Sequence, residues 1–141
     1  MYARLRPYHL IGAIGGFLTV LTAIISLAVS TSYYISAEWV IIVNMLLIGS
    51  NGLIATYFFG AFSASRDSLI KVGSLIAGIG LGFNVLISIL QMAGVYVFVL
   101  ALLGALVMMA GVVIACIKFI MLFQRDAFVV VFCVFIFLGL L

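Results

Sequence analysis

The sequence has 141 residues, of which 69% are apolar and 6% are charged, and its formal net charge is +3. Soluble domains average about 25% charged and about 45–50% apolar residues, so this composition excludes a soluble globular domain and predicts an integral membrane protein. The six Lys and Arg residues are spread over three connecting segments. This spread is typical of membrane orientation, and we expect no nucleic-acid partner because that would need a clustered basic face.

The first predicted transmembrane helix covers about residues 10–30. At 1.5 Å per residue this segment is about 31 Å long, which matches the ~30 Å hydrocarbon thickness of a bilayer. Gly12 and Gly16 form a GxxxG motif in its first half, and this spacing lets a neighbouring backbone approach closely. His9 stands just before the segment, where we expect a polar ring at the membrane interface.

The second predicted helix covers about residues 39–62 and carries polar and small residues in regular spacing. Asn44 and Asn51 are two turns apart and therefore share one face. Gly52 and Gly60 belong to a ladder of small residues on a neighbouring stripe. This ladder predicts close packing against another helix.

Residues 63–71 form the charged connection between the two halves of the chain. Asp67 or Ser68 can accept hydrogen bonds from the backbone amides that open the next helix, and an acid is favoured there by the helix dipole. The connection divides the chain into two predicted membrane hairpins.

The third predicted helix covers about residues 72–92. Gly78 and Gly82 lie one turn apart and predict a further packing face. Asn84 and Gln91 share another face, and Asn84 is at a depth where it could meet Asn44. Such an interhelical amide contact is worth about 0.6–2 kcal/mol in lipid and favours structural packing over a pore lining.

The fourth predicted helix covers about residues 95–117 and follows a short turn at residues 91–94. Gly94 suits the left-handed conformation that ends many helices, and the short turn predicts antiparallel neighbours. Residues 127–141 form an apolar tail of about 22 Å if helical, which is short for a membrane span. The tail is therefore a short fifth span, a helix lying at the interface, or a segment buried against a partner.

The predicted fold is an all-α integral membrane protein with a single transmembrane domain, residues 1–141. It comprises a four-helix bundle of two antiparallel hairpins plus a short apolar C-terminal helix. All the bases fall on one side of this arrangement, and the other side carries Glu38. The positive-inside rule places the basic side, with both ends of the four-helix core, in the cytoplasm of a plasma or inner membrane. The residues that determine this topology are Arg4, Arg6, Arg66, Lys71, Lys118 and Arg125.

The sequence offers few groups for catalysis or metal binding. His9 is the one histidine, and Cys116 and Cys133 lie in apolar runs, where we expect free, buried thiols. A metal or haem site needs several His, Cys or carboxylate ligands, so we expect no metal, no cofactor and no enzymatic activity. The four predicted spans have no acid or base near their centres, which argues against a proton-driven pump.

Three function classes remain open. The first is a non-catalytic accessory or scaffold subunit that adds packed transmembrane helices to a larger assembly, with lipid and other subunits or copies of itself as partners. The second is a small oligomeric channel or transporter with a path lined by the amides. The third is a structural membrane protein of a lipid-containing particle.

Overall fold

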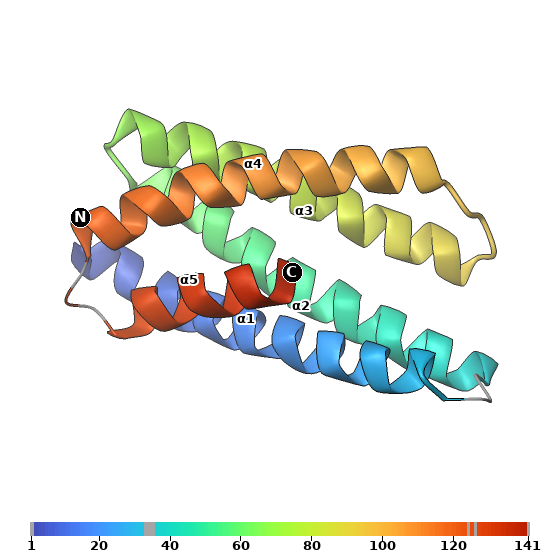
Figure 1. Cartoon of the computed structure of the whole chain (residues 1–141). Coiled ribbons are helices and arrows are strands. Elements are labelled where there is room, and N and C mark those ends of the chain that lie inside the picture. Colours follow the sequence, from blue (N-terminus) through green and yellow to red (C-terminus); the bar gives the residue numbers. More distant parts are fainter. Residues whose placement is uncertain (1, 33–35, 124, 126, 141) are drawn as a thin grey trace.

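The computed structural model describes residues 2–32, 36–123, 125 and 127–140, and this part of the chain is all-helical (Figure 1). Five helices follow one another along the chain, and the described residues contain no strand. The helices are α1 (Tyr2–Ser30), α2 (Ala37–Ala64), α3 (Ser68–Met92), α4 (Phe98–Leu122) and α5 (Ala127–Leu140). The first four are long and apolar enough to cross a membrane.

The helices do not coincide with the apolar segments that the sequence indicates. The α1 helix begins at Tyr2 rather than near residue 10, and α4 runs from Phe98 to Leu122 rather than over 95–117. Hydropathy marks where a segment can lie in lipid, whereas the helix continues as long as backbone hydrogen bonds can form. The predicted bounds describe membrane spans, and the helical bounds of α1 and α4 differ from them at these ends.

Gly94 ends α3 in the manner that the sequence indicates. Its φ is 82°, in the left-handed region that favours glycine. The Gly94 amide donates to the Gln91 carbonyl at 3.0 Å, and the Val95 amide donates to the Leu90 carbonyl at 2.9 Å. These two bonds form a Schellman motif, which satisfies carbonyls at the helix end. The turn itself is longer than expected, because α4 begins at Phe98.

The helices pack in chain order, each against the next, as two antiparallel hairpins (Figure 1). In the described residues α1 makes no backbone contact with α4. Helix α5 packs mainly on α1 and touches α4 more lightly. The start of α1, the α2–α3 connection and the α4–α5 connection all lie at one end of the bundle (Figure 1).

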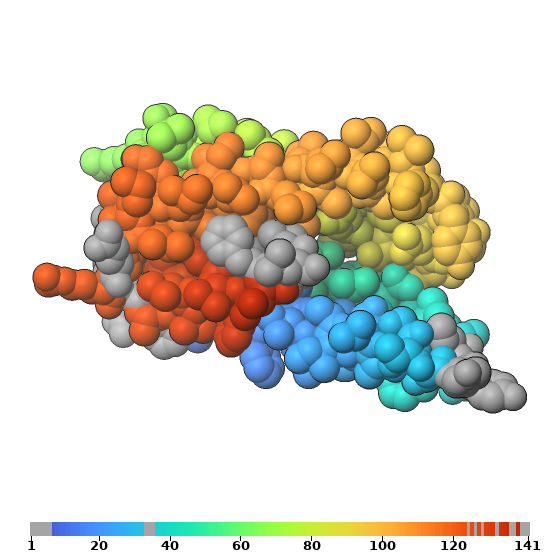
Figure 2. All heavy atoms as spheres, viewed as in Figure 1, coloured from blue at the N-terminus to red at the C-terminus, as the bar shows by residue number. Residues whose placement is uncertain are grey.

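The apolar tail forms helix α5 and packs against its own chain. Val129 and Cys133 on α5 are fully buried. Helix α5 runs in the same direction as α1 and ends partway along it, since 14 residues reach only about 21 Å (Figure 1). On the face shown in Figure 2, the surface is hollowed between α4 and α1 beyond the end of α5.

The closest helix contact joins α3 to α4 through small residues. A Cβ added at Gly80 would lie 2.5 Å from the Met108 amide nitrogen, and one at Gly111 would meet the Ala77 backbone. Positions on both helices recur at alternating spacings of four and three, so each set forms one stripe. The facing stripes are residues 73, 77, 80 and 84 on α3 and residues 104, 108, 111 and 115 on α4.

Candidate functional site

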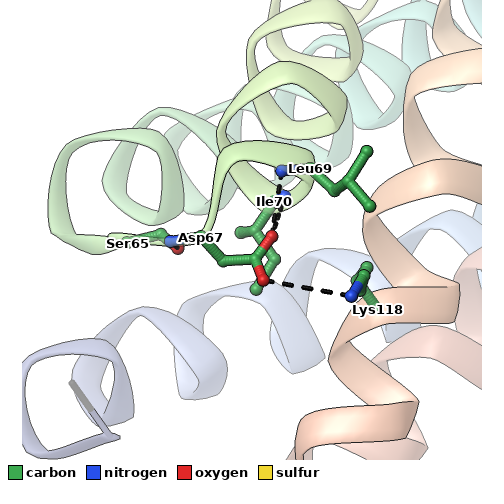
Figure 3. A network of polar contacts seen from close by, with 5 residues as sticks. All are labelled: Ser65, Asp67, Leu69, Ile70 and Lys118. Atoms are coloured by element: carbon green, nitrogen blue, oxygen red, sulfur yellow. Dashed lines mark hydrogen bonds and ion pairs between the residues drawn. The ribbon is translucent and has the colours of Figure 1, made fainter.

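Asp67 organises the α2–α3 connection at the basic end of the bundle (Figure 3). Its Oδ1 accepts hydrogen bonds from the amides of Leu69 at 2.9 Å and Ile70 at 3.1 Å, which confirms the predicted cap of α3. The Asp67 amide donates to Ser65 Oγ at 3.1 Å. Its Oδ2 lies 4.0 Å from Lys118 Nζ on α4. The corner therefore links the α2–α3 connection to α4.

The Asp67–Lys118 pair adds little to stability. Both side chains are 29% exposed, and the two charged atoms are at the limit of an ion pair. Exposed pairs of this kind contribute about 0–1 kcal/mol.

A buried polar contact joins α1 to α2 near the same end. His9 is 1% exposed, and its Nδ1 lies 3.0 Å from the hydroxyl of Tyr57, which is also fully buried. The rings of Phe119 and Phe123 contact the His9 ring edge-on at centroid distances of 5.9 and 5.6 Å. The expected interfacial position of His9 was wrong. Because α1 begins at Tyr2, His9 lies two turns inside the helix and faces the core.

The two cysteines come together in the fold. Cys116 on α4 and Cys133 on α5 are both free and buried, as the sequence predicts. Cys133 Sγ lies 4.0 Å from the Cys116 carbonyl oxygen. This contact forms part of the buried joint between α5 and α4 close to Tyr57, and buried thiols of this kind are chemically inert.

The intramembrane amides do not form one site. Asn44 is 7% exposed and donates to the Val40 carbonyl of its own helix at 2.9 Å. Asn84 donates to Met108 Sδ at 3.2 Å across the α3–α4 contact. The expected meeting of the two amides is therefore not found, because Asn44 bonds within α2 and Asn84 bonds to α4. Asn51 and Gln91 are half-buried.

Four of the six glycines expected in helix packing are buried. Two of these four, Gly60 and Gly78, each lie against an aromatic ring. Gly12 and Gly16 are buried in α1. Gly60 lies under the ring of Tyr8, and a Cβ at Gly78 would lie 3.0 Å from the ring of Phe59.

Gly52 and Gly82 do not pack within the chain, so the prediction of close neighbours for them was wrong. A Cβ at either position would meet no heavy atom of the described residues within 4 Å. Gly82 is one turn from Gly78 but points outward, because the face of α3 that meets α4 carries Gly73 and Gly80 instead. The sequence feature that could have identified this face is the matching spacing of small residues in α3 and α4.

The bases predicted to determine topology lie at one end of the bundle. Lys71 Nζ stands 5.9 Å from the centre of the Phe62 ring, and Arg66 and Arg125 are exposed. Arg4 and Arg6 lie in the first turns of α1, and their side chains are outside the described part of the structure. Glu38 is in the first turn of α2, at the opposite end.

Apolar hollows lined by described residues open on the surface. One, of about 340 Å³, lies between α1 and α5, and another, of about 200 Å³, lies between α3 and α4. Six residues line the first: Ala13, Ile14, Phe17, Ala127, Val131 and Phe135. Seven residues line the second: Ile79, Gly80, Phe83, Leu100, Leu103, Gly104 and Val107.

The fold and these contacts define an all-helical protein with four helices able to span a membrane. Among the residues that the structure describes, no three His, Cys, Asp or Glu side chains are grouped as metal ligands. Comparisons with protein-family models, with curated proteins and with solved structures found no match.

Proposed function

We propose that this chain is an integral membrane protein and serves as a non-catalytic accessory or scaffold subunit of a larger membrane assembly. The observation that carries the proposal is a set of small residues left open on the surface of α2 and α3. We call it the open seam and define it as Gly52, Thr56 and Gly82.

The position of the open seam follows from the contact between α2 and α3. Phe59 covers Gly78 on the outer side of these helices. Thr56 precedes Phe59 by about one turn, and Gly82 follows Gly78 by one turn. Because the helices are antiparallel, both steps lead away from the basic end. Thr56 and Gly82 are both exposed.

Open small residues favour a helix partner. Lipid tails are as apolar as leucine, so membrane helices associate by close backbone packing rather than by hydrophobicity. The α3–α4 contact already uses this chemistry inside the chain through Gly80 and Gly111. The open seam presents the same chemistry to a neighbour, either another subunit or a second copy.

The charge distribution supports one orientation. All six bases lie toward the end that holds the start of α1 and the α2–α3 and α4–α5 connections. Basic connections remain on the cytoplasmic side of membrane proteins. We therefore propose that this end faces the cytoplasm.

Purification from the native membrane in a mild nonionic detergent tests the accessory role. We expect the wild-type chain to be recovered in a complex, and we expect Gly82→Leu to reduce the recovered partner at least tenfold while the melting temperature stays unchanged. Leu106→Phe is the matched control, because Leu106 is a lipid-exposed residue on α4 away from the open seam.

A wild-type chain that is recovered as a solitary, stable monomer would refute the proposal. Equal partner recovery with Gly82→Leu and with Leu106→Phe would refute the open seam as the contact. Recovery of the chain with only itself would identify self-association, and a copy number in the hundreds would instead favour the structural protein of a particle.

A further inference from the structure

Two free cysteines adjoin each other where α5 meets α4. Cys133 Sγ on α5 lies 4.0 Å from the Cys116 carbonyl oxygen on α4, and the two thiols are also in hydrogen-bond contact. Both side chains are free and fully buried. The fold therefore brings together two thiols that lie 17 positions apart in the sequence.

Helix α5 is held in place chiefly by apolar packing. Its 14 residues include no charged, hydroxyl or amide side chain, and Val129 and Cys133 belong to the buried core. The helix packs mainly on α1 and has a lighter contact with α4. A short helix attached in this way opens locally at a lower free energy than the whole bundle. A covalent bond between α4 and α5 would therefore restrict the freedom of α5.

We propose that Cys116 and Cys133 form a redox lock, in which hydrogen peroxide oxidises the two thiols to a disulfide that fixes α5 to α4. One sulfur, as the thiolate, attacks the peroxide; the O–O bond breaks, a sulfenic acid forms and water leaves. The second thiol then displaces the hydroxyl group as a second water, and the S–S bond forms. Both thiol protons end in water, and the two electrons that the sulfurs lose reduce the peroxide.

Burial restricts the lock to a small oxidant. While α5 stays docked, its packing keeps reagents away from both thiols, so the reaction needs a brief local opening of α5. Hydrogen peroxide is uncharged and little larger than water, so a smaller opening admits it than admits N-ethylmaleimide. The disulfide then closes a loop over residues 116–133 and restricts further opening. The inference does not need the accessory role, so either proposal can fail alone.

Mass spectrometry of the full chain in nonionic detergent, before and after treatment with hydrogen peroxide, tests this inference. We expect the wild-type monomer to lose the mass of two hydrogen atoms and to regain it with dithiothreitol. In the oxidised form, hydrogen exchange of the α5 amides should slow by about tenfold, because the bond opposes local opening. The melting temperature should rise by about 5 °C.

Moving one thiol provides the matched control. Cys133→Ala combined with Val131→Cys keeps one thiol on each helix but places that of α5 at an exposed position. Residues two positions apart lie on nearly opposite sides of a helix, so this variant should form no disulfide within the chain. Cys116→Ala and Cys133→Ala each remove the bond by an independent change, so a folding defect in one variant does not decide the result.

Three results would overturn the inference. The first is a wild-type chain that forms no internal disulfide at a peroxide concentration that oxidises the exposed thiol of the Ser63→Cys variant. The second is an equal yield of internal disulfide when the thiol of α5 is moved to position 131. The third is an oxidised wild-type chain whose α5 amides exchange as fast as those of the reduced chain.

Discussion

Gly111 on α4 lies directly against the backbone of Ala77 on α3, with no room for a side chain at position 111. This contact brings the two helices closer than large side chains permit, and it lets Asn84 donate to Met108 Sδ across the interface. Close backbone approach is the main source of helix association where lipid removes the hydrophobic driving force. Glycines such as Gly80 and Gly111 therefore let the α3 and α4 backbones pack in direct contact.

Replacing Gly111 by Ala should destabilise the fold, whereas the same change at Gly82 should not. The added Cβ at 111 meets backbone that cannot turn aside, and such overpacking costs about 1–3 kcal/mol. At Gly82 the Cβ enters open space, and the lower backbone entropy of Ala makes the change neutral or stabilising by up to about 1 kcal/mol. Thermal unfolding in detergent checks this, and equal melting temperatures for the two variants would contradict it.

The contact of His9 with Tyr57 should show a measurable coupling energy. A double-mutant cycle with His9→Leu and Tyr57→Phe isolates the pairwise contribution to the free energy of unfolding. We expect about 0.5–1.5 kcal/mol, as for a neutral hydrogen bond in the core. Tyr96→Phe is the control, because Tyr96 is 81% exposed. A coupling of zero would mean that the two rings only pack.

Asp67 should stabilise the protein through its cap rather than through its charge. Asp67→Ala removes both bonds to the α3 amides and should cost about 1 kcal/mol. Asp67→Asn keeps an acceptor oxygen, so it should cost much less. Lys118→Met should change the unfolding free energy by less than about 1 kcal/mol. A loss with Asn as large as that with Ala, measured by thermal unfolding, would point to the ion pair instead.

Alkylation of the native cysteines should report whether α5 is docked. Cys116 and Cys133 are fully buried, so N-ethylmaleimide should modify neither in the folded chain. Removal of residues 127–141 takes away the helix whose Cys133 contacts the Cys116 carbonyl, and Cys116 should then react. Ser63→Cys, at an exposed position, provides a thiol that reacts in both cases. Equal Cys116 labelling with and without α5 would contradict the docked position.

Several features of the fold follow from local physics and can be predicted from the sequence. Helix number and the apolar spans depend on composition along the chain. The beginning of α3 at Asp67 depends on a side chain that bonds amides two and three residues away. The end of α3 depends on the left-handed conformation of Gly94. The grouping of the bases at one end follows from the alternation of antiparallel helices, which brings the start of α1, the α2–α3 connection and the α4–α5 connection to the same end. None of these features depends on a contact between residues far apart in the sequence.

Only the tertiary structure decided which faces meet. Small residues occur on several stripes of α3, so the sequence alone could not choose Gly80 over Gly82; the choice depends on the complementary stripe of α4. The pairing of His9 with Tyr57 joins residues that are 48 positions apart. The docking of α5 beside α1 likewise depends on the shape that four other helices leave open. Contacts between distant residues depend on complementary surfaces, which come together only in the folded chain.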